Sequence, residues 1–364
     1  MKQTLRDFLC PQPKSKIKAG DGQLKGAYNF YTSSQIQSKF YHSATYTQPA
    51  LIFGTGGMAS VHYCNEPFST STDCLVMYGR LGAPLELIYY YLRSNMHLLQ
   101  DGFKGAGLQH ISKDYILNIN INMPAPSLQE QITHQMRLID AMINGKKQQI
   151  LSFDEAVKSR FIELFGVYPS NPKGWETATI RDIVADVRYG SSRPAVDGGK
   201  YPYLRMNNIT YGGELDLTDT KRIDIPDNEL DKCTVRRGDV LFNRTNSKEL
   251  VGKTCVYNRD EMMVLAGFVI RVRVTERVLP EFLSAFLNTD FSKQMLLGMC
   301  KAAIGQANIN AQEMQNIGIY LPPTELQRQF VQFKEQTDKS KLAVQKGLQE
   351  LEILKKSLMQ QYFG

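Results

Sequence analysis

The sequence predicts an α+β protein with mixed helices and strands, in which two globular lobes are separated by an antiparallel pair of long coiled-coil helices. Three observations predict this class: a gapless internal repeat, strand-like runs bounded by glycine-containing turns in both halves, and two long segments with helical apolar spacing. The chain has 364 residues, which is enough for two domains that each bury a core. The repeat gives the chain a pseudo-two-fold plan.

The repeat is clearest where MPAPSLQEQI at Met123 returns as LPPTELQRQF at Leu321. The stretch 123–166 aligns with 321–364 without a gap, and both stretches end in Phe-Gly. Near the front of each copy, TLRDFL at Thr4 returns as TIRDIV at Thr179. Self-similarity over this length indicates one structural unit written twice. We therefore expect two copies of a globular segment followed by a long helix.

Four segments follow from the repeat: a first lobe over 1–122, a first long helix over 123–166, a second lobe over 167–320 and a second long helix over 321–364. Within the lobes, short apolar runs beside turn residues predict strands, and longer apolar stretches predict short helices. The predicted strands are Ala50–Phe53, Cys74–Met77, Asp239–Phe242 and Val264–Val274, and the predicted short helices are Leu85–Leu98 and Pro280–Leu297.

The two long segments are expected to be helical because each opens with proline and serine or threonine and then contains no further proline. Apolar steps of three and four predict a coiled-coil seam, which Lys334, Thr337 and Lys341 interrupt in the second copy. About 38 residues at 1.5 Å each give a rod of about 57 Å. The alternative is that each helix docks onto its own lobe. The expected helix-pair residues are Ile132, Ile139, Ile143, Ile150, Phe153, Val157, Leu164, Phe330, Val344, Leu348, Leu351, Leu358 and Tyr362.

Composition excludes several classes of protein. No apolar run approaches the roughly 20 residues that span a bilayer, and the N-terminal residues lack the apolar core of a signal peptide, so we expect a cytoplasmic protein. The six cysteines include no C-x-x-C pair, which favours free thiols. His62, Cys64 and Cys74 match no common metal-site spacing, so no metal is expected. The net charge of +7 permits an anionic partner without requiring one.

Arginine is unevenly distributed, because 12 of the 18 arginines lie in 167–320. Arginine makes paired hydrogen bonds to phosphates and to guanine edges, so the second lobe is a candidate for reading a nucleic acid. The alternative for each arginine is an ion pair with one of the 19 acidic residues of the same segment.

Polar loops follow the predicted strands, and such loops on a rigid sheet commonly carry recognition residues. RYGSSR begins at Arg188 and NRTNSK at Asn243, while FKGAGLQHIS (103–112) and CKAAIGQANIN (300–310) precede the long helices. Glutamine and asparagine suit an adenine edge, and lysine suits phosphate. A plain turn before a strand is the alternative. The expected DNA contacts are Lys104, Gln109, His110, Arg188, Ser191, Ser192, Arg193, Arg205, Asn243, Arg244, Asn246, Lys248, Lys301, Gln306 and Asn308.

Catalytic signatures do not fit this chain. LVGKT at Leu250 lacks the first glycine of a phosphate-binding loop, no NPPY or DPPY tetrapeptide of amino-methyltransferases occurs, and PDNELDK at Pro226 departs from the nuclease pattern at Leu230. The histidines have no spacing with a nucleophile or a metal ligand. We therefore expect a binding protein with no catalytic residue. An enzymatic alternative would place an unrecognised site in the loops at Gly54 or Gly190.

This layout resembles the specificity (S) subunit of a type I restriction–modification system over nearly the whole chain. The resemblance is carried by a G-x-Q-x-x-I-type stretch at the end of each lobe, an apolar strand, a helix opening of the LPP…EQ type and the repetition of this order. Ala125 and Arg328 depart from the proline and glutamate that the family commonly has. The residues that carry the resemblance are Pro124, Leu128, Gln129, Gln131, Pro322, Pro323, Leu326, Gln327, Gln329 and PKGWETATIRDIV at Pro172.

The resemblance implies a non-catalytic subunit that reads a split, asymmetric site on double-stranded DNA, with one target-recognition lobe per half-site and the helix pair as a ruler. Neighbouring major-groove faces on one side of B-DNA are about 34–36 Å apart, which such a rod would span. The implied partners are two methyltransferase (M) subunits, which carry S-adenosylmethionine, and restriction (R) subunits, which use ATP and Mg. No cofactor is expected on this chain. The competing hypothesis is a coiled-coil scaffold whose lobes bind proteins.

Overall fold

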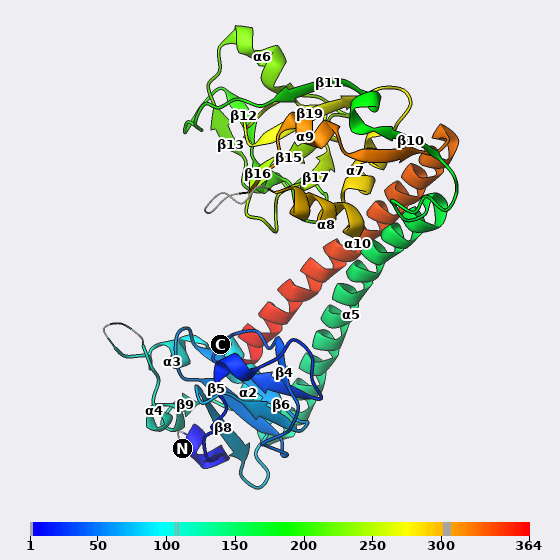
Figure 1. Cartoon of the computed structure of the whole chain (residues 1–364). Coiled ribbons are helices and arrows are strands. Elements are labelled where there is room, and N and C mark those ends of the chain that lie inside the picture. Colours follow the sequence, from blue (N-terminus) through cyan, green and yellow to red (C-terminus); the bar gives the residue numbers. More distant parts are fainter. Residues whose placement is uncertain (1–2, 106, 108, 301–306) are drawn as a thin grey trace. The chain divides into compact units, whose positions relative to one another are not determined.

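The computed structural model describes residues 3–105, 107, 109–300 and 307–364. The chain forms two compact units: unit 1 contains Met1–Gln148 and Val344–Gly364, and unit 2 contains Gln149–Ala343. In the colours of Figure 1, the blue strands and the red end of the chain belong to unit 1, whereas the yellow strands belong to unit 2. Each unit therefore holds one globular lobe together with parts of both long helices.

The central sheet of unit 1 is antiparallel, with strands in the order β2-β8-β5-β6. Strand β5 reads ALIFG and is buried at every position. Leu51 and Phe53 pack in the core that contains helix α2, while Ala50 and Ile52 pack in a second core on the other face, as the period-2 alternation of a strand requires. These elements are β2 (Leu9–Pro11), β5 (Ala50–Gly54), β6 (Ser60–Cys64), β8 (Cys74–Gly79) and α2 (Leu85–Ser94).

The second core of unit 1 lies under a three-stranded sheet in the order β4-β3-β7, in which β3 and β7 are parallel. A two-stranded ribbon of β1 and β9 joins the front of the lobe to the segment before the long helix. The remaining elements are β1 (Gln3–Thr4), β3 (Tyr28–Tyr31), β4 (Lys39–Tyr41), β7 (Phe68–Thr70), β9 (Asn120–Ile121), α1 (Leu5–Phe8), η1 (Ala19–Asp21), α3 (His97–Gln100) and α4 (Lys113–Leu117).

Unit 2 repeats this plan with a central antiparallel sheet in the order β11-β19-β15-β17. In β15, Val240 and Phe242 pack in the core that contains helix α7, and Leu241 packs in a core on the opposite face. Strands β2, β8, β5 and β6 of unit 1 thus correspond to these four strands in order. The elements are β11 (Val184–Tyr189), β15 (Val240–Asn243), β17 (Thr254–Val256), β19 (Val269–Val274) and α7 (Pro280–Leu287).

A second sheet of unit 2 has the order β13-β12-β18-β14, with β12 and β18 parallel, like β3 and β7 of unit 1. Two ribbons, β10-β21 and β16-β20, complete the lobe. The remaining elements are β10 (Glu176–Thr179), β12 (Tyr201–Leu204), β13 (Lys221–Ile223), β14 (Thr234–Val235), β16 (Thr245–Asn246), β18 (Met263–Leu265), β20 (Ala307–Asn308), β21 (Gly318–Leu321), η2 (Ile180–Ile183), η3 (Met206–Asn208), α6 (Asp227–Cys233), α8 (Asp290–Met299) and α9 (Ala311–Gln315).

Three predicted elements are divided in the structure. The run predicted as one strand over Val264–Val274 is two strands, β18 and β19, in different sheets, because the chain turns at residues 266–268. The predicted helix Pro280–Leu297 breaks into α7 and α8, where Thr289 caps the second helix by accepting a hydrogen bond from the Ser292 amide (3.2 Å). The predicted helix Leu85–Leu98 likewise breaks into α2 and α3.

The residues that repeat in the sequence make the same hydrogen bonds in both lobes. The Thr4 amide donates to the Asp7 carboxylate, and the Thr179 amide donates to the Asp182 carboxylate, each at 2.8 Å. The Leu5 amide meets the Ile119 carbonyl (3.1 Å) as the Ile180 amide meets that of Ile317 (2.9 Å), and the same front turns are held by Arg6–Asn118 (3.1 Å) and Arg181–Asn316 (3.0 Å). The repeat therefore preserves the joint between the start of each lobe and its end.

The two long helices are α5 (Pro126–Phe165) and α10 (Thr324–Phe363), drawn in green and in orange to red in Figure 1. The compact units cut both helices near their middles instead of following the predicted domain boundaries at 122/123, 166/167 and 320/321. The reason is packing: each half-helix shares a core with one of the lobes. Among the residues that the structure describes, no helix has the length and apolarity needed to cross a bilayer.

Candidate functional site

In unit 1, α5 and α10 run antiparallel. Their pairing is marked by the hydrogen bond from the Tyr362 hydroxyl to the Gln135 carboxamide oxygen (2.7 Å) and by the ion pair of Lys355 with Asp140. The predicted seam residues Ile132, Ile139 and Ile143 are buried, and the partly buried Leu348, Leu351, Leu358 and Tyr362 pack against the same core. That core also contains lobe 1. The helices therefore pair with each other, as expected, and they also dock onto lobe 1. The first half of α5 packs on its own lobe, as the alternative had it, whereas the end of α10 packs on the lobe of the other copy.

In unit 2, the helix pair is fastened by aromatic rings that the seam prediction largely missed. The Phe161 ring lies 5.3 Å from that of Phe330 and 5.5 Å from that of Phe282 in α7. Phe165, at the end of α5, is fully buried in the same cluster. Of the predicted seam residues, Phe330 is fully buried, Val157 and Leu164 pack partly buried against this core, Val344 is buried at the edge of unit 1, and Ile150 and Phe153 are half-buried outside the cores.

The Phe-Gly that ends each copy closes a core in the lobe of the other copy. Phe165 ends the helix that follows lobe 1, yet it is buried in unit 2. Phe363 ends the helix that follows lobe 2, yet it is buried in unit 1, where its ring lies 5.9 Å from that of Tyr91 and its carbonyl accepts from Asn95 (3.1 Å). The phenylalanine that ends each long helix therefore has the same role in both copies.

The candidate DNA-binding loops of lobe 2 lie together at one end of the central sheet. Strands β16 and β20 pair Thr245 with Asn308, and the Ile309 amide donates to the Arg244 carbonyl (2.9 Å). On the other side of the same end, the Tyr189 hydroxyl accepts from the Ala311 amide (2.9 Å). Segments near residues 189, 244 and 308, predicted separately, thus form one surface. Lys301 and Gln306, also predicted there, lie outside the described residues.

Two of the predicted contacts in this surface are buried. Asn243 is fully buried, and its amide donates to the carbonyls of Thr245 and Phe268, both at 3.2 Å. Ser191 is 4% exposed, and its amide donates to the Leu265 carbonyl (2.6 Å). Both residues hold the loops in place, and burial leaves them no surface for a base. We therefore correct these two expectations to structural roles.

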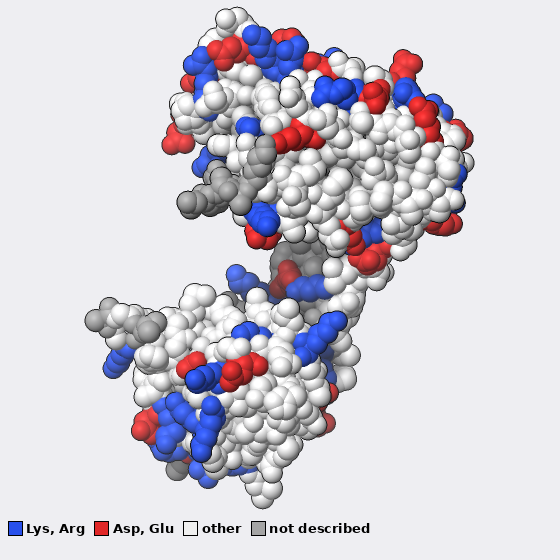
Figure 2. All heavy atoms as spheres, viewed as in Figure 1, with Lys and Arg blue, Asp and Glu red and all other residues white. Residues whose placement is uncertain are grey.

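Most arginines of lobe 2 form ion pairs with acidic residues of the same lobe, which is the alternative to a nucleic-acid contact. Seven of the 12 form ion pairs among the described residues, and Figure 2 shows basic and acidic side chains interleaved on the face of unit 2 that it presents. Three of the seven are predicted DNA contacts: Arg188 with Asp186 (2.8 Å), Arg193 with Glu229 (2.7 Å) and Arg205 with Asp219 (2.7 Å). Their guanidinium groups are already engaged, so they are weaker candidates for reading bases.

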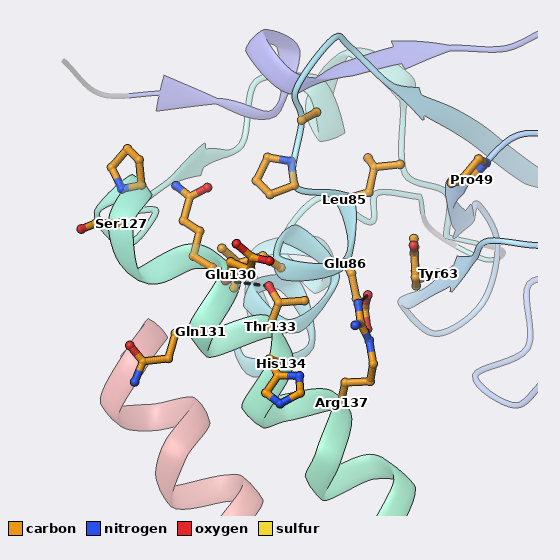
Figure 3. Close-up of a pocket in the computed structure, with 15 residues that line it drawn as sticks. Pro49, Tyr63, Leu85, Glu86, Ser127, Glu130, Gln131, Thr133, His134 and Arg137 are labelled. Atoms are coloured by element: carbon orange, nitrogen blue, oxygen red, sulfur yellow. Dashed lines mark hydrogen bonds and ion pairs between the residues drawn. The ribbon is translucent and has the colours of Figure 1, made fainter.

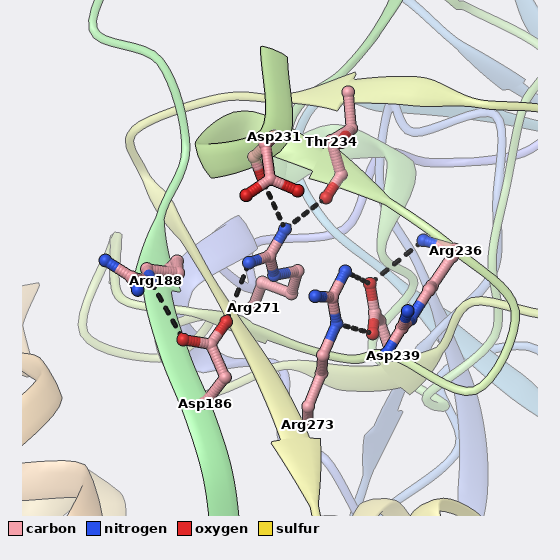
Figure 4. Close-up of polar contacts among 8 residues, drawn as sticks. All are labelled: Asp186, Arg188, Asp231, Thr234, Arg236, Asp239, Arg271 and Arg273. Carbon is pink, nitrogen blue, oxygen red and sulfur yellow. Dashed lines mark hydrogen bonds and ion pairs between the residues drawn. The ribbon is translucent and has the colours of Figure 1, made fainter. Parts of the chain in front are cut away.

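Figure 4 shows the most buried of these networks. The Arg271 side chain is 3% exposed and donates to the carbonyls of Asp231 (3.3 Å) and Thr234 and to the Asp186 carboxylate (2.7 Å). Burial disfavours the charged form of Asp186, but hydrogen bonds from Arg271 and Arg188 outweigh it and hold the pKa of this carboxyl below its usual value. The network joins β11 and β19 to α6, and it is structural.

Arg244 differs from these arginines. Among the described residues, no carboxylate lies within ion-pair distance of its guanidinium group. Its Cζ lies 5.0 Å from the centroid of the Tyr189 ring, a cation–π contact, and its Nη1 reaches the Gly267 carbonyl at 3.5 Å. Tyr189 is 44% exposed and the neighbouring Phe268 is 51% exposed. The surface therefore presents a half-buried cation that lies over the Tyr189 ring, and the exposed Phe268 follows at the backbone position opposite.

Four predicted polar residues surround Arg244 or its loops. Lys248, Ser192 and Asn308 are exposed, whereas Asn246 is half-buried and donates to the Asn243 side chain (3.0 Å). The Asn308 carboxamide oxygen accepts from the Thr245 hydroxyl (3.3 Å), which leaves its amino group toward solvent as a donor. Lys248 and Asn308 therefore present exposed polar side chains beside Arg244.

In lobe 1, Lys104, Gln109 and His110 are all exposed. The amides and carbonyls of Lys104 and His110 exchange two hydrogen bonds of 3.0 Å, so these two residues form an antiparallel bridge. The His110 Nδ1 lies 3.1 Å from the Thr55 carbonyl. Beside it is a hollow of about 690 Å³ that Lys14 and Lys113 also line. Basic and amide side chains therefore gather at the end of the sheet in lobe 1 as well.

The two ends of the sheets share one backbone framework. In lobe 1 the Thr55 amide donates to the Asp73 carbonyl (2.9 Å), and the Thr55 carbonyl accepts from the Ile111 amide (3.2 Å). In lobe 2 the Arg244 amide donates to the Phe268 carbonyl (3.0 Å), and the Arg244 carbonyl accepts from Ile309. Thr55 and Asp73 therefore occupy the positions of Arg244 and Phe268. The same frame carries different side chains.

A groove of about 880 Å³ in unit 1 lies away from this surface, at the start of α5 beside α2. Figure 3 shows Arg137 of α5 reaching Glu86 of α2, with two hydrogen bonds of 2.6 and 3.2 Å. At the matching place in unit 2, the Gln327 carboxamide oxygen of α10 accepts from the Leu279 amide (2.8 Å) at the start of α7. In unit 1 the residue before α2 is Pro84, which has no amide hydrogen to donate.

Four candidate residues were not predicted from the sequence. Lys14 and Lys113 lie far apart in the chain and meet only at the hollow of lobe 1. Tyr189 was within the quoted RYGSSR loop, so its aromatic ring beside a glycine was an available signal. Phe268 fell inside the run predicted as one strand, which hid it. A Gly-Phe pair in the middle of such a run was the signal for a turn.

The sequence matches the protein family described as type I restriction modification DNA specificity domain over residues 3–152 and 172–353. It is 24% identical over 234 residues to the type I restriction enzyme EcoKI specificity subunit of Escherichia coli strain K12, covering 59% of this chain and 50% of the relative. It is 27% identical over 196 residues to the putative type I restriction enzyme MjaX specificity subunit of Methanocaldococcus jannaschii, covering 53% and 46%. The chain spans about half the length of these curated relatives.

Solved structures with a similar fold include the S subunit of a type I restriction–modification system from M. genitalium, with a TM-score of 0.63, 14% identity, and coverage of 100% of this chain and 96% of that chain. A chain from a study of complex assembly and conformational transition in the type I R-M system has a TM-score of 0.51 at 16% identity, covering 100% and 97%. At these identities the likeness concerns the fold alone.

Proposed function

Because the chain belongs to the type I restriction modification DNA specificity domain family, we propose that it binds double-stranded DNA at a two-part asymmetric sequence, with each lobe reading one half. The single observation that carries this proposal is the shared frame with different side chains. The same frame carries the exposed Asp73 in lobe 1, where Thr55 is buried and its hydroxyl donates to the Asp73 carbonyl (2.9 Å), and it carries Arg244 and Phe268 in lobe 2, so the two lobes present different chemistry. Such a pair of lobes suits two unlike half-sites.

The chain would recognise the DNA sequence and would not catalyse a reaction itself. The residues gathered at the two sheet ends are donors, cations and aromatic rings, which position and recognise a base. In the proposed complex, methyltransferase (M) subunits bind S-adenosylmethionine and methylate adenine, and restriction (R) subunits use ATP and Mg. This chain would bind none of these cofactors itself.

The long helices would dock the methyltransferase subunits. Outside their buried seams, α5 and α10 expose several large apolar side chains that do not pack between the two helices. In unit 1 these are Leu138, Met142, Ile353 and Leu354, and in unit 2 they are Leu151, Ile162 and Leu342, each 46–69% exposed. Apolar side chains that remain exposed on paired helices support a protein partner there.

The helix pair would also set the distance between the half-sites. Each helix has 40 residues, which at 1.5 Å per residue gives about 60 Å. Half-sites one turn of B-DNA apart are separated by about 34–36 Å, which lies within this length. We therefore propose that the bases between the half-sites contribute little to recognition.

Co-expression with the cognate methyltransferase subunit, followed by mapping of methylated adenines across a genome, tests the proposal. We expect a split motif with two defined halves and an undefined gap of constant length. Purified complex should bind that duplex with an affinity that falls steeply as salt is added, because phosphate contacts release counterions. A protein scaffold would give neither methylation at a split motif nor salt-dependent duplex binding, and either absence would contradict the proposal.

A further inference from the structure

We propose that Arg244 and Phe268 form the base-reading pair of lobe 2, with Arg244 hydrogen-bonding a guanine edge and Phe268 covering the 5-methyl group of a thymine on the same or the next base pair. This inference rests on the proposed function, since it names what one lobe reads. It assigns a role to Phe268, which carries no hydrogen-bonding group on its side chain, and it predicts part of the half-site.

The backbone places the two side chains together. Asn243 pairs with Val269 in the antiparallel ladder, and the next residues outward are Arg244 and Phe268, joined by the amide-to-carbonyl hydrogen bond of 3.0 Å. Neither residue belongs to a strand, but this hydrogen bond extends the ladder by one pair, which sets their Cα atoms about 5 Å apart. Base pairs of a duplex follow each other at about 3.4 Å. Two such side chains therefore reach the same base pair or adjacent ones.

The guanidinium group of Arg244 is available and oriented. It lacks a carboxylate partner among the described residues, and the face of the Tyr189 ring at 5.0 Å limits the planes that it can adopt. The Tyr189 ring is itself held, because its hydroxyl accepts from the Ala311 amide. A held, planar fork of donors matches the O6 and N7 acceptors of guanine in the major groove.

Phe268 presents an apolar ring from a rigid turn. The Phe268 carbonyl accepts from both Asn243 and Arg244, and the flanking Gly267 amide donates to the Ser191 carbonyl (2.7 Å). The turn is also too tight for a larger residue at Gly190, where an added Cβ would lie 2.2 Å from the Leu265 carbonyl oxygen. The backbone that carries this 51% exposed ring is therefore already ordered before binding. The thymine methyl is the apolar group that the major groove offers.

Lobe 1 gives the contrast. Its frame carries Asp73, exposed, at the position of Phe268, and at the position of Arg244 it carries the buried Thr55, whose hydroxyl donates to the Asp73 carbonyl. A carboxylate accepts a hydrogen bond from the cytosine amino group and gains nothing from a methyl group. The thymine-methyl dependence should therefore be confined to the half-site of lobe 2.

Modified bases test the pair directly. With the complex of this chain and its methyltransferase subunit, the affinity for the mapped duplex is measured while each thymine is replaced by uracil and each guanine by 7-deazaguanine in turn. We expect one thymine of one half-site at which uracil weakens binding by roughly three- to fivefold, as for one lost methyl contact. Replacing an adjacent or paired guanine with 7-deazaguanine, which lacks N7, should weaken binding by roughly five- to tenfold.

Variants assign each effect to its residue. In Phe268→Ala the uracil effect should vanish while the 7-deazaguanine effect remains, Phe268→Leu should retain part of the uracil effect, and Arg244→Ala should abolish the 7-deazaguanine effect. Tyr211→Ala, which removes a 55% exposed ring elsewhere in lobe 2, is the matched control and should retain both effects.

Two failures are distinguishable. If the complex does not bind the duplex or no split motif exists, the proposed function fails. If the complex binds normally but no uracil substitution weakens it, or if the uracil effect persists in Phe268→Ala, the reading pair is wrong while the proposed function stands.

Discussion

Lys341 of α10 donates a hydrogen bond of 2.6 Å to Asp154 of α5 and thereby fills the gap in the apolar seam of the second helix. Its side chain is only 10% exposed, and it also meets Glu214 of the lobe at 2.8 Å. Lys341, one of three residues that interrupt the apolar seam, therefore connects both helices with lobe 2. A polar group inside a helix pair commonly fixes its register.

Replacing Lys341 with Met should destabilise unit 2, because the two carboxylates would lose their shared cation. Both acids are about half exposed, so we expect a loss of about 1–2 kcal/mol, less than for a fully buried pair. Chemical denaturation measures it. Lys339→Met, an exposed lysine of the same helix, should change stability by less than about 0.5 kcal/mol.

The same variant has a pH signature. Burial opposes the charge of Lys341, but hydrogen bonds to Asp154 and Glu214 raise its pKa above the ordinary value. A raised pKa means that the stabilisation is complete below the unfolded pKa of about 10.4 and is lost as pH rises through the folded value. The stability gap between wild type and Lys341→Met should therefore be constant near neutral pH and shrink only above about pH 10.4. A gap that shrinks between pH 7 and 9 would contradict this assignment.

Phe330→Ala should be among the most damaging core substitutions. Phe330 is fully buried and its ring lies 5.3 Å from that of Phe161 and 5.7 Å from that of Phe165. Removing a buried phenylalanine costs about 3–5 kcal/mol. Calorimetry should show an earlier transition for unit 2. Leu342→Ala, at an exposed position of the same helix, should change the free energy of unfolding by less than about 0.5 kcal/mol.

Arg244→Ala should weaken recognition in one half-site alone, by about 1–3 kcal/mol if a bidentate guanine contact is lost. The measurement is the affinity for duplexes with substitutions in each half-site. Arg237→Ala removes an arginine that pairs with Asp260 on the surface and should bind like wild type. Equal losses in both half-sites would argue against lobes that read independently. The Gln306 side chain, also expected to contact this half-site, lies outside the described residues.

Lengthening the helix pair should change the tolerated gap between half-sites. Gly145 of α5 has open space around it, and Gly347 of α10 faces Lys146, with 3.7 Å from an added Cβ to its Cε. Four residues inserted after Gly145 and four after Gly347 would add about 6 Å to both helices. We expect methylation to move to sites with a gap longer by about two base pairs. Four substitutions to alanine at the same places serve as the control, and an unchanged gap would rule out the ruler.

The buried thiols should be unreactive in the folded protein. Burial raises the pKa of Cys74 to about 12, and it raises the pKa of Cys255 to about 12 as well. Because the thiolate is the reactive form, both should resist alkylation at pH 8, whereas Cys10 is exposed and should react. Mass spectrometry of labelled peptides measures each site, and unfolding in denaturant should make all of them react. Rapid labelling of Cys255 in the native protein would contradict its burial.

Much of the fold could be predicted because its signals are local. Proline at the start and helical apolar spacing afterwards define α5 and α10, and ALIFG is a strand whichever face it turns to. The turn at Gly267 was missed because the apolar residues on both sides make one continuous run. Local pattern cannot separate two strands of different sheets when both are buried.

The candidate site could be predicted only in part. Loops near residues 188, 244 and 308 were recognised by their residue types, but Asn243 has the same type and is fully buried. Exposure depends on what the rest of the chain places beside a residue. Arg188 and Arg244 likewise look equal in sequence, and only one of them has an aspartate within 2.8 Å.

By itself, the sequence determined that the chain contains one plan twice, with a lobe and a long helix in each copy, because repeated letters and helical periodicity are properties of neighbouring residues. Only the tertiary structure decided that Phe165 and Phe363 are buried in each other's lobes and that Phe268 stands beside Arg244. Those relationships join residues from distant segments, and they form because packing and hydrogen bonding act between atoms that are close in space, however far apart they lie along the chain.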